Sequence, residues 1–526
     1  MIDLLPHLIV APIVLPLATA AVLVSLGEKY RRARSLVHLA STLAGVLVAT
    51  TLLARVDAGG GVQAVGVYLA GNWEAPFGIV LVADRLSALM LVLCGVVSLC
   101  AALYAESAWA HVGVYFHPLF QLQLMGLNGA FLTGDLFNLF VFFEVMLAAS
   151  YGLQLHGSGW PRVRSGLHYI AVNLLASTLF LVGVAVLYGV VGTLSMADIA
   201  AKLPFVPWSD RGLLHVGMAI LAVAFLVKAA TWPLNAWLVP AYTAASAPVA
   251  ALFSVMTKVG VYVLVRLWTL FFSDGGPSLH FGGPVLLNAG LATLAFGTLG
   301  LTSSMRLGRI AAYSVIVSSG TLLAALGTGL ASATAAALFY MLSATLTASA
   351  LFLLVELIQR IGTEGRSRLP DSDVEPGQDT NLDDEQAPLV GRVYPLSIVW
   401  IGTAFVCCAL LVAGLPPLSG FVAKLSLLTA VLSVEGGAQI DAALLPIAWW
   451  ILGLLLLSGL GATLSFSRVG IRHFWSAKRG LSPHVTALEA TSVSVLLLCC
   501  AVLTVCAEPV LRYTSATAAA LHAPRP

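Results

Sequence analysis

Long apolar stretches, repeated fourteen times along 526 residues, most limit what this chain can fold into. They lie near residues 3–26, 35–56, 79–103, 113–133, 136–155, 166–191, 213–239, 247–272, 284–303, 309–328, 333–358, 394–436, 443–466 and 487–505. A helix needs about 20 apolar residues to cross a hydrocarbon core of about 30 Å. The sequence therefore predicts an all-α, polytopic integral membrane protein with about 14 transmembrane helices.

Composition excludes a water-soluble protein and several kinds of site. Hydrophobic residues make up 59% of the chain and charged residues only 10%, whereas soluble domains have about 25% charged residues. The net charge of +2 and the absence of a basic stripe give no reason to expect nucleic acid as a partner. The seven cysteines show no metal-ligand spacing, and no nucleotide-binding loop occurs. We therefore expect no metal, no cofactor and no enzymatic site on this chain.

The distribution of basic residues sets the expected topology. The stretch 394–436 is too long for one straight span, and the segment GLPPLSG (414–420) interrupts it. Treated as one broken span, it leaves sixteen of the 26 basic residues on the cytoplasmic side and six outside. Two full spans would move four of those sixteen outside, so we predict one broken span with both termini on the outer side.

Two hydrophilic segments stand out between the spans. Residues 361–392 include eight acidic residues and are expected to form a flexible cytosolic loop. Residues 67–90 alternate apolar and small residues around glycine and proline, which predicts a short outer hairpin before the third span.

Four ionisable residues lie deep in predicted spans: Glu144, Lys228, Lys258 and Lys424. A charge at the bilayer centre costs about 2.5–3.5 kcal/mol, so each needs a partner or a function. A carboxylate near a buried lysine favours its charged form and a more distant one lets it deprotonate, which would make a proton switch. A static ion pair between Glu144 and Lys228 is the structural alternative. For Arg266 we expect structural pairing or snorkelling.

Prolines and a histidine complete the candidate site. Pro233 and Pro240 in the seventh stretch, and Pro416 and Pro417 in the twelfth, each accompany a nearby lysine. Matched helix breaks of this kind point to a transport site between inverted repeats. His168 lies toward the inner end of its span and is a candidate for proton entry, or else a structural hydrogen-bond donor.

Three segments resemble a known family. TGDLFNLFVFFEVMLAASYGLQLHG (133–157), FLVKAATWPLNAWLVPAYTAASAPVAALFSVMTKVGVYVLVR (225–266) and GLPPLSGFVAKLSLL (414–428) are similar to the D-type subunit of the multisubunit Mrp-type monovalent cation/proton antiporters. The pattern of lysines and broken helices is shared with antiporter-like subunits of NADH-quinone oxidoreductase and membrane-bound hydrogenases.

The resemblance implies four parts: residues 1–112 with helices 1–3 and the hairpin, a five-helix repeat at 113–272, an inverted repeat at 284–466 that includes the acidic loop, and a last helix with its tail at 487–526. The seventh and twelfth helices are broken, and Glu144, Lys228, Lys258 and Lys424 form a hydrated row for protons. It further implies the bacterial inner membrane, other membrane subunits as partners, and protons with Na+ or another monovalent cation as transported ions.

One departure and two alternatives remain. Ser343 and Ala348 stand where many relatives carry titratable residues, so hydroxyls and water would have to bridge Lys258 and Lys424. A sodium site needs several oxygen ligands, and this chain has only one deep carboxylate. The first hypothesis is therefore that this chain conducts the protons of the exchange, driven by the proton gradient, and that Na+ passes mainly elsewhere in the complex. The alternatives are a proton-pumping subunit of a redox complex and a non-transporting assembly scaffold.

Overall fold

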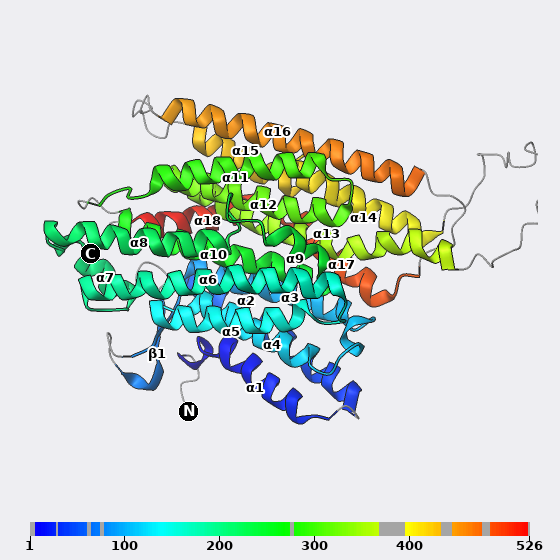
Figure 1. Cartoon of the computed structure of the whole chain (residues 1–526), viewed down its shortest axis with the longest axis horizontal. Coiled ribbons are helices and arrows are strands. Elements are labelled where there is room, and N and C mark those ends of the chain that lie inside the picture. The colour runs from blue at the N-terminus through cyan, green and yellow to red at the C-terminus, as the bar shows by residue number, and fades with distance from the viewer. Residues whose placement is uncertain are drawn as a thin grey trace, which may run out of the picture.

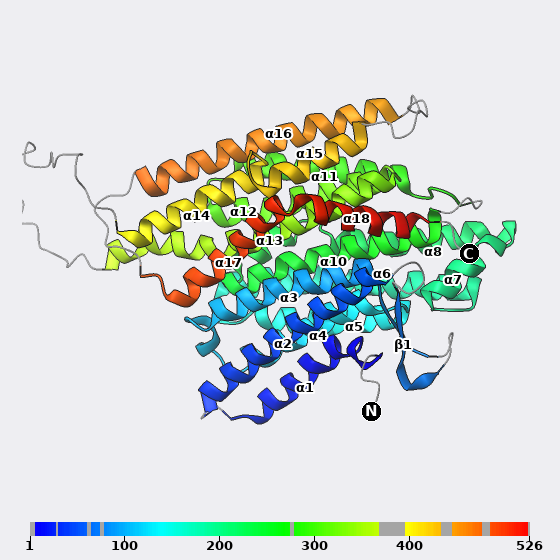
Figure 2. The same cartoon turned by 180° about the vertical axis from the view of Figure 1, so that it is seen from behind.

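The computed structural model describes residues 6–27, 30–59, 65–73, 78–273, 278–367, 395–432, 444–475 and 484–523. Helices fill most of these ranges, and the long ones lie side by side along the longest axis of the molecule (Figures 1 and 2). The parallel and antiparallel packing of many apolar helices is the arrangement that a bilayer requires, because each helix satisfies its own backbone hydrogen bonds.

The elements follow one another in this order. The chain starts with α1 (Ala11–Ser25), α2 (Arg31–Ala58), β1 (Gly66–Leu69), β2 (Val80–Ala83) and α3 (Arg85–Ala105). The next group is α4 (Phe116–Leu132), α5 (Leu136–Gln154), α6 (Trp160–Val191), α7 (Met196–Lys202), α8 (Trp208–Lys228), α9 (Leu238–Ala244) and α10 (Ala247–Phe272). Then come α11 (Gly283–Ser303), α12 (Leu307–Gly327), α13 (Ala331–Ser367), α14 (Leu396–Ala413), α15 (Ser419–Leu432), α16 (Leu444–Gly470), α17 (Ala487–Val505) and α18 (Ala507–His522).

The predicted spans correspond to these helices. Within the described ranges, twelve helices are long and apolar enough to cross a membrane. The shorter α1 and α4, of 15 and 17 residues, coincide with the first and fourth predicted stretches. The stretches 213–239 and 394–436 are each divided, the first into α8 and α9 and the second into α14 and α15. The all-α membrane architecture with two broken spans is therefore confirmed.

The two ends of the bundle differ in charge. The strands, α7 and the end of α18 lie at one end, which we call the hairpin end (Figure 1). At the other end α2, α6, α12, α14 and α17 begin. We call it the basic end, because arginines such as Arg34, Arg162 and Arg306 lie at or beside these helix starts.

The predicted hairpin is present. β1 and β2 pair antiparallel, with Gly66 opposite Ala83. The Gly134 amide donates to the Val80 carbonyl at 2.9 Å, so the hairpin is also attached to the turn between α4 and α5. Directly after β2, Asp84 caps α3 by accepting a hydrogen bond from the Ser87 amide at 2.9 Å. The hairpin therefore fixes where the third span begins.

The last span extends beyond its predicted end. The residues expected to form a tail after 505 continue as α18, which packs along α13 (Figure 2). Cys506 separates the two helices, and Pro509 lies in the first turn of α18, where its missing amide hydrogen costs little. α18 buries Thr514, Thr517 and Ala518, a face of small residues that hydropathy alone does not reveal.

The centre of the bundle is α10. The apolar window of α10 is buried throughout, and those of α12 and α13 are nearly so. Lys258 lies on α10 itself and Lys228 on α8, which packs against α10, whereas Lys424 lies on α15, which packs against α13. The fold thus places Lys258 in its most enclosed part, and Lys228 and Lys424 on helices that border this part.

Candidate functional site

The first halves of the two broken spans end in the same way. After α8, Ala230 has a φ of 56°, and the next amide donates to the Leu226 carbonyl at 3.0 Å. After α14, Gly414 has a φ of 74°, and the next amide donates to the Leu410 carbonyl at 3.0 Å. A left-handed residue followed by this longer-range hydrogen bond is a Schellman ending. The matched prolines of the seventh and twelfth stretches therefore mark two equivalent interruptions of the backbone.

The prolines divide between the breaks and a helix. Pro233, Pro416 and Pro417 lie in the non-helical segments that separate α8 from α9 and α14 from α15. Pro240 differs from the expectation, because it lies inside α9 as its third residue. A proline is tolerated there since the first helical turn has no internal acceptor for its amide.

Lys228 is the last residue of α8 and is 6% exposed. Its ammonium donates to the Ser177 hydroxyl of α6 at 3.4 Å and lies 5.3 Å from the centre of the Phe143 ring. A cavity of about 10 Å³ beside it is lined by Asn173 and Trp237 among others. A space of this size is close to the volume that one water molecule needs.

Glu144 lies on α5 near Lys228 but makes no direct contact with it. Among the described residues no ion pair joins the two, although their charges interact electrostatically. One carboxylate oxygen of Glu144 is buried without a hydrogen-bond partner in the described part of the chain. The contact ion pair that the structural alternative requires is absent from this conformation.

Lys258 is the most buried of the three lysines, with 1% exposure at the middle of α10. Its ammonium donates to the hydroxyls of Ser318 and Ser319 on α12, the latter at 3.4 Å. Two residues further on, Gly260 lies so close to the first break that a Cβ there would be 2.7 Å from the Ala229 amide nitrogen. This approach packs α10 against the end of α8, whereas Lys258, two residues earlier, lies on the opposite face of α10 and points toward α12.

Lys424 forms hydrogen bonds across the second break, between α15 and the end of α14. Its ammonium, carried by α15, donates to the carbonyls of Val412 at 3.1 Å and Ala413 at 2.9 Å. These are carbonyls of the last turn of α14, which have no partner inside the helix. Gly459 of α16 packs on the same point, because a Cβ there would be 2.7 Å from the Ala413 carbonyl oxygen. Each break is thus covered by a glycine of the next span.

Hydroxyl groups occupy the region between Lys258 and Lys424. Ser254 of α10 and Ser349 of α13 are 2.7 Å apart, and Ser343 of α13 is 2.8 Å from Ser419 at the start of α15. Ser343 therefore does contact the second broken span, although it cannot titrate. Ala348 is 4% exposed and belongs to the apolar core.

His168 lies apart from the lysines. It is exposed on α6 and lines a cavity of about 920 Å³ at the basic end, together with Pro240 and Thr243 of α9. The structure thus brings His168 next to the second half of the first broken span. It does not bring it into contact with Lys228.

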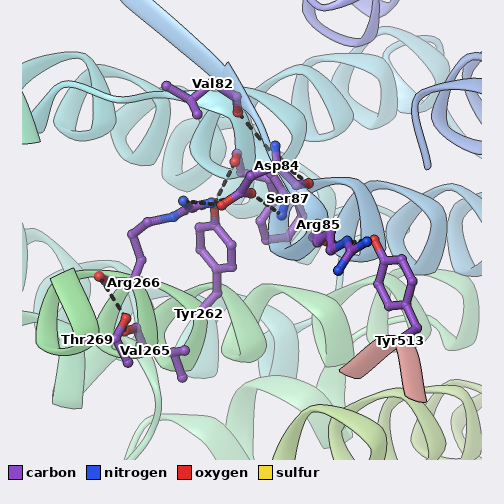
Figure 3. A network of polar contacts seen from close by, with 10 residues as sticks. Val82, Asp84, Arg85, Ser87, Tyr262, Val265, Arg266, Thr269 and Tyr513 are labelled. Atoms are coloured by element: carbon purple, nitrogen blue, oxygen red, sulfur yellow. Dashed lines mark hydrogen bonds and ion pairs between the residues drawn. The ribbon is translucent and has the colours of Figure 1, made fainter. Parts of the chain in front are cut away.

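Arg266 makes the structural pairing expected of it. Its guanidinium binds the Asp84 carboxylate with two bonds of 2.6 and 2.8 Å and also donates to the Tyr262 hydroxyl at 2.8 Å (Figure 3). Burial opposes ionisation of Asp84, but Arg266 outweighs it and holds the pKa of that carboxyl below its usual range. This pair joins α10 to the start of α3 and lies outside the row of lysines.

The sequence interpretation missed three of the polar residues that surround the lysines. Asn173, Ser318 and Ser319 are all buried and lie against deep charges. The signal was weak, since most serines in these spans donate only to their own helix, as Ser314 does to the Ala311 carbonyl. Among the described residues there is also no group of three or more histidine, cysteine or acidic side chains that could hold a metal ion.

Known proteins with the same architecture were found by sequence and by structure. A family model described as NADH:quinone oxidoreductase/Mrp antiporter, TM, matches residues 133–445. The D-type subunit of a probable K(+)/H(+) antiporter from Rhizobium meliloti is 50% identical over 100% of this chain and 97% of its own length. The D-type subunit of a Na(+)/H(+) antiporter from Alkalihalophilus pseudofirmus is 35% identical over 90% of this chain and 88% of its own.

Solved structures agree with this. A chain of the Mrp complex from Dietzia sp. superposes with a TM-score of 0.80 at 26% identity, covering 98% of both chains. A chain of respiratory complex I from Thermus thermophilus has a TM-score of 0.75 at 21% identity, covering 98% of this chain and 99% of that one, and shares the fold. This multi-pass membrane chain therefore belongs to the D-type subunit family of the Mrp-type antiporters.

Proposed function

We infer that the chain is a membrane subunit of a multisubunit monovalent cation/proton antiporter, in which protons move along Glu144, Lys228, Lys258 and Lys424. The observation that carries this inference is the environment of the three lysines. Each ammonium is buried and held by hydroxyls or carbonyls, and none of the described residues forms a direct ion pair with it. Lys228 and Lys424 lie at the two helix breaks, and Lys258 lies in the middle of α10.

This environment suits proton transfer. A buried ammonium without a carboxylate contact is close in energy to the neutral amine, so a small change of surroundings can release its proton. A hydroxyl can accept and donate hydrogen bonds, so Ser177, Ser318 and Ser319 can pass a proton to or from water. Glu144 would favour the charged form of Lys228 when its carboxylate approaches. Ser343 and Ser419 would continue the path toward Lys424.

The orientation of the chain in the membrane is inferred from the charge of the two ends. We place the basic end in the cytoplasm of a bacterial inner membrane, with both termini outside, because basic residues concentrate on the cytoplasmic side. His168 would then lie at the cytoplasmic mouth of the path. The proton gradient would supply the driving force, and we assign this chain the role of a transporter subunit and not that of an enzyme. The monovalent cation crosses mainly through other subunits.

Exchange assays on the whole complex test this inference. Inverted vesicles from a strain without other antiporters would carry the wild-type complex, Glu144→Gln or Lys228→Met. We expect at least a tenfold loss of cation-driven proton movement at normal complex abundance. The controls are Glu508→Gln and Lys202→Met, which neutralise exposed residues that pair within their own helices.

If exchange survives both Glu144→Gln and Lys228→Met, protons do not move along the proposed path. If instead both substitutions only lower the amount of assembled complex, the chain acts as a scaffold. Co-purification with iron–sulfur or flavin subunits would favour the redox-linked proton pump, which shares this fold.

A further inference from the structure

A large basic cavity lies outside the row of lysines. It has a volume of about 920 Å³, lies at the basic end between α6, α9, α12 and α13, and is lined by Arg164, Arg306 and Arg309. We call these three residues the cavity arginines. Three guanidinium groups around one space create a positive potential there, because like charges lie close together and no acidic residue is among the described residues that line the cavity.

The cavity arginines lack the partners that neighbouring arginines have. No hydrogen bond or ion pair to any described residue satisfies their guanidinium groups. By contrast, Arg162 donates to the Ala244 carbonyl at 2.9 Å, and Arg360 pairs with Glu356 at 2.7 Å. The donors of the cavity arginines therefore remain available to an anion, and guanidinium binds phosphate in a bidentate manner.

Two helix starts add to the positive potential. α6 begins at the cavity with Trp160 and Pro161, and Arg306 is the residue that precedes α12. Neither helix has a side-chain cap, so the Trp160 amide of α6 and the Leu307 and Gly308 amides of α12 have no intrahelical partner. The positive ends of both helix dipoles reinforce the charge of the arginines.

An apolar surface continues from the cavity along α6. Leu167, Leu174 and Leu181 are exposed at intervals of seven residues, which places them on one face of the helix. Trp160 is 73% exposed at the cavity itself. Tryptophan at this position is typical of the level of lipid headgroups. A charged pocket that opens onto an apolar helix face matches a molecule with an anionic head and long apolar tails.

We propose that this cavity binds the phosphate headgroup of an anionic phospholipid, with the acyl chains along the exposed face of α6. Basic pockets between membrane helices at the cytoplasmic level are suited to such headgroups. The bound lipid would lie beside α9 and His168, and would neutralise the positive potential at the mouth of the proposed proton path. Lipid binding is measured directly, so a failure of this proposal is distinct from a failure of the transport function.

Native mass spectrometry of the whole delipidated complex, titrated with cardiolipin or with phosphatidylcholine, tests the proposal. The variant R306Q/R309Q is compared with R32Q/R472Q, which removes two exposed arginines of the same predicted side away from the cavity. Each basic residue near an anionic headgroup contributes about fivefold to binding, so the cavity variant is expected to bind cardiolipin about 30-fold more weakly. The control and the binding of phosphatidylcholine should not change.

Three outcomes would overturn the proposal. Equal cardiolipin binding by both variants would show that the arginines do not hold the headgroup. Displacement of the lipid by millimolar inorganic phosphate would identify a site for a free anion. Loss of complex assembly in R306Q/R309Q with unchanged lipid binding would assign the cavity to a carboxylate of a partner subunit. R306K/R309K keeps the charge, and substantial cardiolipin binding by it would support the proposal.

Discussion

Lys258 depends on two serine hydroxyls for the hydrogen bonds of its ammonium. The double substitution S318A/S319A would leave this nearly fully buried ammonium without those partners, at a cost of about 1–3 kcal/mol for each lost bond. We expect exchange by the assembled complex to fall at least fivefold and its pH optimum to shift to lower pH, because the neutral amine becomes favoured. Exchange in inverted vesicles across a pH series measures both effects.

Ser314→Ala is the matched control for that variant. Ser314 lies on the same helix and is buried, but it donates to the Ala311 carbonyl of its own helix. We expect its removal to leave the pH profile unchanged. An identical profile for S318A/S319A would mean that the hydroxyls do not take part in holding or passing the proton.

Asp84 and Arg266 test the difference between a structural and a functional charge. Asp84→Asn would leave the largely buried Arg266 without its carboxylate, which typically costs about 3–5 kcal/mol. We expect a lower thermal unfolding temperature and less complex in the membrane, but unchanged exchange per assembled complex. The control is Asp57→Asn, since the Asp57 carboxylate is 57% exposed and lies 3.5 Å from Arg85. Impaired exchange at normal abundance would instead place Asp84 in the transport path.

For single residues, the sequence identifies buried charges better than it identifies their hydrogen-bond partners. Glu144, Lys228, Lys258 and Lys424 are conspicuous because a charge in an apolar stretch is costly and rare. Their serine and asparagine neighbours are not, since hydroxyls and amides occur in most spans. Which of them faces a lysine depends on how each helix is rotated against its neighbour, and that is fixed by packing between residues far apart in sequence.

Gly459 shows how one helix can hold a break in another. A methyl group at this position would collide with the Ala413 carbonyl oxygen, which accepts from Lys424. We expect Gly459→Ala to push α16 away from the break, to lower stability by about 1–3 kcal/mol and to reduce exchange. Thermal unfolding and vesicle exchange of the complex measure the two effects.

Gly453 on the same helix provides the comparison. A Cβ there meets nothing within 4 Å. Alanine is favoured over glycine in a helix by up to about 1 kcal/mol, so Gly453→Ala should be neutral or slightly stabilising. If the two alanine substitutions change unfolding temperature and exchange equally, close packing of α16 on the break does not contribute to stability or transport.

Broken helices are predictable where the breaking residues are unmistakable. The segment 414–420 combines prolines and glycines, and the distribution of basic residues between the two sides of the membrane argues against two full spans. The continuation of the last span as α18 was not predictable in this way. Its sequence mixes charged and small residues, and its helix buries a face of threonine and alanine against α13, a pattern that average hydropathy does not detect.

At the level of the whole molecule, the last span ties distant parts of the chain together. Glu489 at the start of α17 is 1% exposed, pairs with Arg360 of α13 at 2.8 Å and accepts a hydrogen bond from Ser107 at 2.9 Å. Arg360 also binds Glu356, which accepts from the Trp109 indole at 2.8 Å. The segment after α3 and the helices α13 and α17 are therefore joined at the basic end.

Glu489→Gln tests whether this network holds the protein together. The substitution removes the buried charge that faces Arg360, but Arg360 keeps Glu356 as a partner, so we expect a cost of about 1–3 kcal/mol. We expect a lower unfolding temperature and reduced abundance of the complex, with unchanged exchange per assembled complex. Glu508→Gln is the control, because Glu508 also pairs with an arginine of the last span but its carboxylate is 82% exposed, and exposed pairs contribute about 0–1 kcal/mol. Equal stability of the two variants would show that this network does not hold the last span in place.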